Sequence, residues 1–149
     1  MMTQAETNDG LALLLAERAC QRLAVLHSQY VDAGELEKLM ALFAEDAVWE
    51  HAAGRYQGLA EIRGFFQQIT SAPGRVSRHV ISNQQVDIVD AATAVGTMYL
   101  TLYRAVVGEN DSANLEGQPV MVGEYEDVYV NTEAGWRFKS RRLKNAFLR

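Results

Sequence analysis

The feature that most constrains the fold is a change in hydrophobic spacing near residue 74. Before this point, apolar residues recur every three or four positions, which is typical of amphipathic helices. After it, β-branched and aromatic residues alternate with polar ones over long runs, which is typical of strands. Helices followed by strands indicate an α+β domain. A curved, mostly antiparallel sheet folding over the helices would leave a pocket between the two layers.

The helical spacing predicts three helices, over Leu11–Ala33, Glu35–Phe43 and Leu59–Ile69. Gly34 suits the left-handed position that follows a helix, so the first helix is expected to end there. Residues 1–10 are polar, and we expect them to form a flexible N-terminus.

The strand patterns predict one short strand before the third helix and four long strands after it. The expected strands span 47–51, 78–89, 91–107, 120–130 and 136–148. Gly54 and Gly58 bracket an expected turn, and Asn131–Gly135 reads as a hairpin turn. Residues 108–117 read as a polar loop.

The size and charge of the chain limit the classes of function. A chain of 149 residues predicts one domain, here 11–149. The formal net charge of -5 argues against nucleic acid and an anionic membrane surface as partners. The apolar run over 11–16 is too short to span a membrane. Cys20 is the only cysteine, so no internal disulfide can form, and a reducing, cytoplasmic location is expected.

Three residues far apart in the chain could form an acid–base site. Asp32 lies at the end of the first predicted helix, His79 opens a strand, and Arg141 lies in the last strand. A carboxylate that bonds one imidazole nitrogen fixes the tautomer and leaves the other nitrogen free as a base. Arg141 could hold developing negative charge. Strand alternation makes either Arg141 or Arg142 face inward, and Arg141 does so if a bulge precedes it.

Several segments, taken in order, resemble the SnoaL-like group of the nuclear-transport-factor-like, cystatin-like α+β cone superfamily. The resemblance covers nearly the whole chain. The segments that carry it are 30–34 (YVDAG), 42–49 (LFAEDAVW), Gly58, 78–83 (RHVISN), 123–127 (GEYED) and 135–138 (GWRF).

The resemblance implies a cone-shaped fold with an internal pocket. Its pattern is closest to hexachlorocyclohexane dehydrochlorinase and bile-acid 7α-dehydratase, whose aspartate, histidine and arginine positions match Asp32, His79 and Arg141. His27 stands where the dehydrochlorinase has a lysine and the dehydratase a tyrosine. Met98 stands near the position of a second histidine in scytalone dehydratase, so the chemistry of that enzyme is not expected here.

Candidate substrate contacts lie on the faces that should line this pocket. They are His27, Tyr30, Trp49, His51, Phe65, Met98, Tyr125 and Asp127. Each has an ordinary alternative as a core residue. Tyr125 could donate to a substrate oxygen or fill space, and Asp127, if buried, needs a partner such as Arg141.

These residues predict a cofactor-independent acid–base enzyme that acts on a small hydrophobic ring compound, by elimination first and isomerisation second. Metal-ligand spacings and glycine-rich phosphate motifs are absent from the sequence, so no cofactor is expected. The alternative is a non-catalytic binding protein or an assembly partner like the small subunit of a dioxygenase. A homo-oligomer, dimer or trimer, is expected in either case, with Leu100, Leu102 and Val106 on the convex face as apolar contacts.

Overall fold

A computed structural model describes residues 1, 3–107 and 119–148 of the chain. The polar loop predicted over 108–117 lies outside the described residues. The elements are α1 (Gln4–Ala33), α2 (Leu36–Met40), β1 (Phe43–His51), β2 (Gly54–Gln57), α3 (Gly58–Thr70), β3 (Arg75–Ile88), β4 (Thr93–Val106), β5 (Met121–Thr132) and β6 (Gly135–Leu148).

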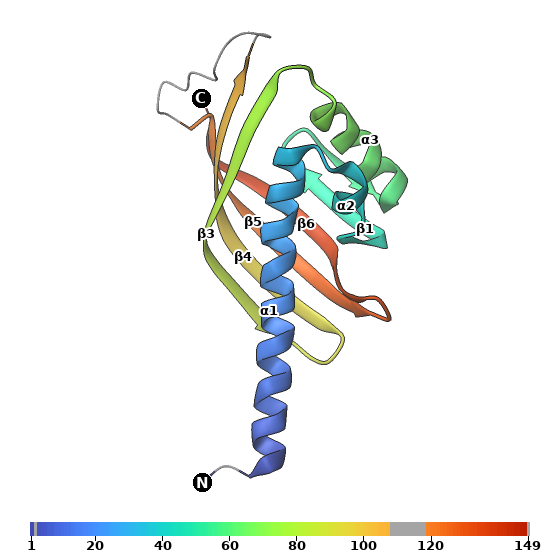
Figure 1. Cartoon of the computed structure of the whole chain (residues 1–149), viewed down its shortest axis with the longest axis vertical. Helices are drawn as coiled ribbons and strands as arrows, with labels where there is room; N and C mark the ends of the chain where they lie inside the picture. The colour runs from blue at the N-terminus through green and yellow to red at the C-terminus, as the bar shows by residue number, and fades with distance from the viewer. Residues whose placement is uncertain (2, 108–118, 149) are drawn as a thin grey trace.

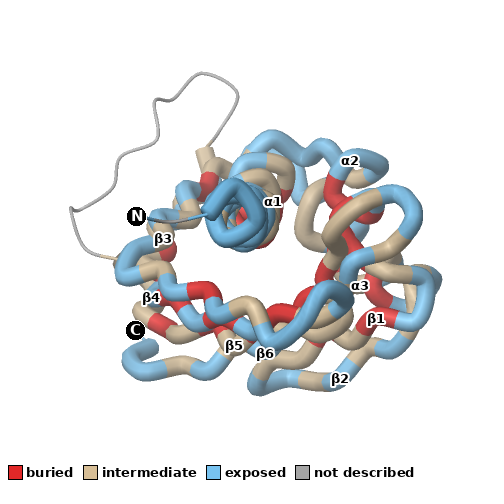
Figure 2. The backbone as a smooth tube through the Cα atoms, turned by 90° about the horizontal axis from the view of Figure 1, so that it is seen from below, coloured by how far each residue is buried: buried red, intermediate tan, exposed pale blue. Residues whose placement is uncertain are grey.

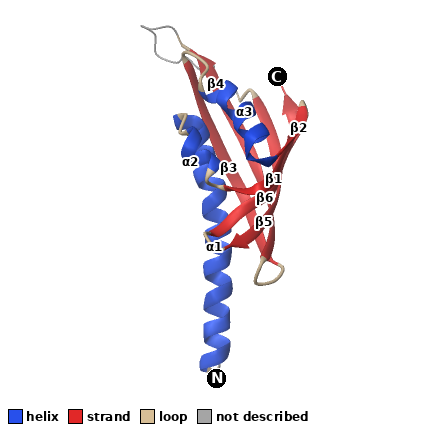
Figure 3. Ribbon diagram, turned by 90° about the vertical axis from the view of Figure 1, so that its right-hand side faces the viewer, coloured by secondary structure: helices blue, strands red, loops and turns tan. Residues whose placement is uncertain are grey.

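The strands form one six-stranded sheet in the order β2-β1-β6-β5-β4-β3. Among the described strands, β1 and β6 pair in parallel and the other neighbours are antiparallel. Seen along α1, the sheet curves from β3 beside that helix round to β1 and α3 (Figure 2). The helices lie on the concave side (Figure 3). The predicted α+β class and curved sheet are confirmed.

The first helix begins at Gln4, so the predicted start at Leu11 is wrong. Thr3 and Glu6 form a capping box: the Glu6 backbone N–H donates to the Thr3 hydroxyl, and the Glu6 carboxylate accepts from the Thr3 backbone N–H at 2.7 Å. The cap extends the helix through the polar segment. Its end is as predicted, because Gly34 adopts φ +72°.

The C-terminal half of α1 packs on the sheet, while the N-terminal half projects past the strands (Figure 1). The buried positions recur every three or four residues along one face: Cys20, Leu23, Ala24, His27, Ser28 and Val31. Asp32 lies in the last turn of α1, next to Val31 of this face, and its carboxylate reaches Ser77 and His79 near the start of β3. Within the described residues, no helix is long and apolar enough to cross a membrane.

Between α1 and α3, the chain forms less helix and more strand than predicted. The second helix ends at Met40, and Phe43 instead begins β1 and pairs with Phe138 of β6. Residues 54–57 form β2 instead of a turn, because they pair antiparallel with Val48–His51. The apolar spacing of residues 36–43 suits either a helix or a strand. Pairing with β6 makes Phe43 part of a strand.

Register shifts in β3 and β6, two of those in the sheet, set which side chains of these strands face the helices. In β3 the register shifts between Ser82 and Gln85, where Asn83 has φ +51°. In β6, Val128 pairs with Ser140 and Tyr129 with Phe138, so Lys139 is the extra residue. This bulge places both Phe138 and Arg141 in the core and leaves Arg142 at the surface, where it pairs with Glu50 at 3.1 Å.

The prediction that Leu100 and Leu102 lie on the convex face is wrong. Both are buried, because the even-numbered residues of β4 from Ala94 to Leu102 face the helices. Val106, near the end of the strand, is exposed, but it continues the same even-numbered face and pairs with Arg75, so it is not on the convex face either.

Candidate functional site

A partly open cavity of about 470 Å³ lies between the C-terminal half of α1, helix α3 and the concave face of the sheet. Its wall is mostly apolar, with several polar groups directed into it. The lining residues are His27, Val31, Trp49, His51, Phe65, Phe66, Ile69, Arg75, His79, Leu102, Arg104, Val120, Met121, Tyr125, Leu143, Asn145 and Leu148.

Asp32 and His79 form a hydrogen-bonded pair at this cavity. Asp32 Oδ1 lies 2.6 Å from His79 Nδ1, and Asp32 Oδ2 accepts the backbone N–H of His79 at 2.9 Å. The Ser77 hydroxyl donates to Asp32 Oδ1 at 2.8 Å. Three contacts therefore fix the carboxylate, and the carboxylate orients the imidazole.

Local structure explains this convergence. Ser77 and His79 are two residues apart in β3, so both side chains point to the concave face, where the end of α1 crosses. Gly34 ends α1 immediately after Asp32, which leaves the carboxylate beside the strand. In the described part of the chain, no hydrogen bond occupies His79 Nε2, and the imidazole lines the cavity.

The environment keeps Asp32 ionised. Burial acts to raise the pKa of this carboxyl, but hydrogen bonds from His79 and Ser77 outweigh burial and hold the pKa below its ordinary value. An ionised Asp32 accepts a hydrogen bond from the Nδ1–H of a neutral imidazole, and Nε2 of that tautomer carries no proton. The arrangement can therefore present a base to the cavity.

His27 also faces the cavity, from the inner face of α1. It is 1% exposed and is surrounded by the rings of Phe43, Trp49, Phe66, Tyr125 and Phe138 at 5.5–6.1 Å. Neither ring nitrogen has a hydrogen-bond partner among the described residues. Burial, followed by the charges of Arg141 and His79, lowers the pKa of His27 well below its ordinary value, so the ring is neutral.

Four other predicted contacts, Trp49, His51, Phe65 and Tyr125, line the same cavity. Trp49 Nε1 and His51 Nε2 are buried and have no partner among the described residues. Burial, the largest influence, raises the pKa of the Tyr125 hydroxyl to about 12, so this group keeps its proton and can donate.

Arg141, Asp127 and Met98 lie in a layer behind Tyr125 and not on the cavity wall. The Arg141 guanidinium stacks 3.7 Å from the centre of the Tyr125 ring, and one of its nitrogens is 3.4 Å from Met98 Sδ. Arg141 Nε lies 3.5 Å from Asp127 Oδ1, and neither atom has a hydrogen-bond partner in the described chain. The Tyr129 hydroxyl donates to Asp127 Oδ2 at 2.9 Å. Burial raises the pKa of Asp127 to about 6, against the lowering effect of Arg141.

Tyr30 is partly buried at the edge of the core, beneath the Lys38 ammonium, and is not among the lining residues.

Sequence reasoning missed Ser77, Arg75, Arg104 and Asn145. Ser77 and Arg75 could have been found by counting back in steps of two from His79. Arg104 required the register of β4 on β3, which the sequence does not reveal.

The three histidines line one cavity although they are distant in sequence. In the parts of the chain that the structure describes, they do not form a cluster with Cys, Asp or Glu that could hold a metal ion.

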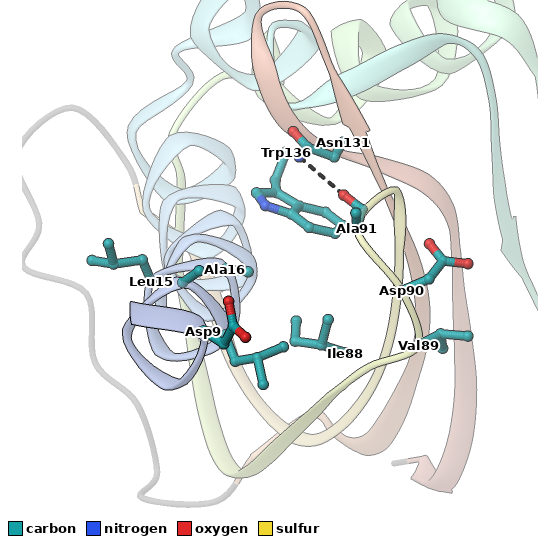
Figure 4. Close-up of a pocket in the computed structure, with 11 residues that line it drawn as sticks. Asp9, Leu15, Ala16, Ile88, Val89, Asp90, Ala91, Asn131 and Trp136 are labelled. Atoms are coloured by element: carbon teal, nitrogen blue, oxygen red, sulfur yellow. Dashed lines mark hydrogen bonds between the residues drawn. The ribbon is translucent and has the colours of Figure 1, made fainter. Parts of the chain in front are cut away.

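A second hollow of about 760 Å³ lies at the opposite end of α1, beside the β3–β4 and β5–β6 turns (Figure 4). Its wall includes Leu13, Ile88, Val89 and Trp136, and Asn131 donates to the Ala91 carbonyl there at 3.2 Å. Its ionisable wall residues are Asp9 and Asp90, so it lacks a paired acid and base. The Asp32–His79 pair lies at the first cavity.

The fold and the cavity define an α+β cone protein of the cystatin-like class. A family model described as a SnoaL-like domain matches residues 12–142, and the chain belongs to this family. A search of curated proteins finds no match.

Solved structures from two bacteria share the fold. An NTF2-like protein with a cystatin-like fold from Novosphingobium aromaticivorans is 20% identical, with a TM-score of 0.80 over 98% of this chain and 92% of that one. A proposed scytalone dehydratase from the same organism is 23% identical, with a TM-score of 0.78 over 91% and 87%. A hexachlorocyclohexane dehydrochlorinase from Novosphingobium barchaimii is 18% identical, with a TM-score of 0.76 over 94% and 92%. At these identities the likeness establishes the fold alone.

Proposed function

We propose that this protein is a cofactor-independent acid–base enzyme that acts on a small hydrophobic ring compound, as a dehydratase-like lyase first and an isomerase second. The observation that carries the proposal is the Asp32–His79 pair, with Oδ1 and Nδ1 2.6 Å apart at a mostly apolar cavity. A hexachlorocyclohexane dehydrochlorinase, an enzyme named for an elimination from a ring compound, shares this fold, which supports the proposed reaction class.

In the elimination, His79 Nε2 takes a proton from a ring carbon. The C–H electron pair becomes the new C=C bond, and the hydroxyl group leaves the adjacent carbon with its bonding pair. The His79 imidazolium then gives its proton to the departing hydroxide, so water is released and the neutral base is restored. Asp32 stabilises the imidazolium that forms. Tyr125 and the neutral His27 donate hydrogen bonds to the departing oxygen, and the Arg141 guanidinium acts on Tyr125 through their stacked contact. In an isomerisation, the imidazolium returns the proton to another carbon.

The test uses proton abstraction, the step that both reactions share. A panel of cyclic ketones and cyclic β-hydroxy ketones is incubated with the protein in D₂O, and mass spectrometry follows deuterium uptake and loss of water. We expect His79→Gln and Asp32→Asn to lower the rate by about 10²-fold or more. Asp87→Asn, which changes an exposed carboxylate on the same strand, is the matched control.

Equal rates in the wild type and both site variants would exclude the pair from the mechanism. Binding of panel members without exchange or water loss in the wild type would favour the alternative function, a non-catalytic binding protein. Thermal unfolding of each variant shows whether a lost rate reflects lost structure.

A further inference from the structure

The wall of the cavity carries a positive charge that the Asp32–His79 chemistry does not use. Arg75 and Arg104 both line it, and the lining residues in the described part of the chain include no carboxylate. The whole protein has a formal net charge of -5, so general basicity does not explain two arginines here.

Pairing between β3 and β4 brings the two arginines to one end of the cavity. Arg75 pairs with Val106 and Ser77 with Arg104, so Arg75 and Arg104 are diagonal neighbours on the concave face. Such neighbours lie roughly 7–8 Å apart at Cα. Like charges at this spacing repel each other unless an anion lies between them.

The Arg75 guanidinium is held in place by one hydrogen bond, but its hydrogen-bonding capacity is not fully used. Its Nη1 donates to the Ile69 carbonyl at 3.0 Å, which fixes the guanidinium between β3 and the last turn of α3. Its Nη2 is buried and has no hydrogen-bond partner among the described residues. The ion pairs of residues 3–107 and 119–148 include neither Arg75 nor Arg104. Asp32, the carboxylate beside the cavity, is committed to Ser77 and His79.

We propose that Arg75 and Arg104 form an anion subsite, and that the ligand of this cavity is an apolar ring compound that bears a carboxylate. Guanidinium groups match a planar carboxylate in geometry and charge. The apolar wall, which includes Phe65, Ile69 and Leu102, suits the ring. A cavity of about 470 Å³ has the size of a small-molecule site. The subsite rests on the proposed function only in taking this cavity as the substrate site.

Binding tests this subsite without requiring turnover. The probes are two matched pairs, 2-naphthoate with 2-naphthamide and cyclohexanecarboxylate with cyclohexanecarboxamide, titrated by calorimetry at low salt. We expect the wild type to bind at least one acid about tenfold or more tightly than its amide. Arg75→Gln and Arg104→Gln should each weaken the acid about tenfold and leave the amide within about twofold. Arg75→Lys, which keeps the charge without the planar fork, should restore part of the loss.

Arg78→Gln is the matched control, because Arg78 is exposed on the same strand and its loss changes the net charge equally. The assay reads binding and not turnover, so a failure of the catalytic proposal would leave this test of the subsite unaffected. Equal affinity for acid and amide, or no binding of either acid, would overturn the subsite. So would a loss in Arg78→Gln equal to that in Arg75→Gln.

Discussion

The Asp32 carboxylate binds His79 twice, through the ring nitrogen at 2.6 Å and through the backbone N–H at 2.9 Å. The backbone contact ties the end of α1 to β3, and the ring contact orients the imidazole. One side chain therefore joins the stability of the cone to the geometry of the site. This double role predicts that the pair affects folding as well as activity.

Asp32→Asn should destabilise the protein by about 1–3 kcal/mol at pH 7, because charge-assisted hydrogen bonds are lost. Contacts with His79 and Ser77 hold the pKa of Asp32 below its ordinary value of 3.8, against burial. The stabilisation is therefore full above pH 4 and is lost as the pH falls through the lowered pKa. Urea unfolding from pH 7 to pH 3 should show the gap to wild type closing in acid. A gap of the same size at every pH would contradict this assignment.

His27→Leu should match or exceed the wild type in stability, because it replaces two buried, unpartnered nitrogens with a side chain of similar volume. Burial lowers the pKa of His27 below 6.5, so wild-type stability is full above pH 6.5 and falls as the pH decreases. The advantage of the variant should therefore grow from pH 7 to pH 5, by up to about 1.4 kcal/mol per pH unit. Thermal unfolding across this range measures it, with His51→Leu as the control at a less buried ring. A constant difference between variant and wild type would show that His27 is not buried in neutral form.

Arg141→Met should destabilise the protein by about 3–5 kcal/mol at neutral pH, because it leaves Asp127 buried without its cation. The pKa of Asp127 is already raised to about 6, so the folded state holds this proton more tightly than the unfolded chain. Protonation relieves the unpaired charge, and the loss should therefore be smaller at pH 5 than at pH 8. Urea unfolding at both pH values provides the test. Arg142→Met, at the exposed neighbour, should cost less than about 1 kcal/mol. Equal losses for the two variants would contradict the assignment of Arg141 to the core.

We predict a homo-oligomer, and the apolar surface for it lies on the projecting half of α1. Leu11 and Leu14 are 55% and 64% exposed on this half, where they border a hollow beside residues 86–88 of β3. Leu14→Glu should shift the protein toward monomer in sedimentation velocity runs, since a charge on an apolar interface opposes association. Gln29→Glu adds a charge on the same helix further along and should leave association unchanged. A wild-type monomer at every concentration would contradict this prediction.

The candidate site shows where sequence reasoning succeeds and where it stops. Asp32, Gly34 and His79 could be found because local signals mark them: the end of a helical period, a left-handed glycine and the start of an alternating run. Ser77 and Arg75 follow from the same alternation once His79 is assigned. Arg104 could not be found, because its position depends on pairing with a strand nearly thirty residues away.

The sequence by itself determined the kinds of elements, their order and the end of the first helix, since these depend on residue spacing within a short segment. Tertiary structure decided the rest. The bulge at Lys139 turned Arg141 into the core and Arg142 to the surface, and strand pairing converted residues 54–57 from a turn into β2. The physical reason is that a bulge, a register and a cavity wall each require two segments to meet, and no local pattern encodes where the second segment will lie.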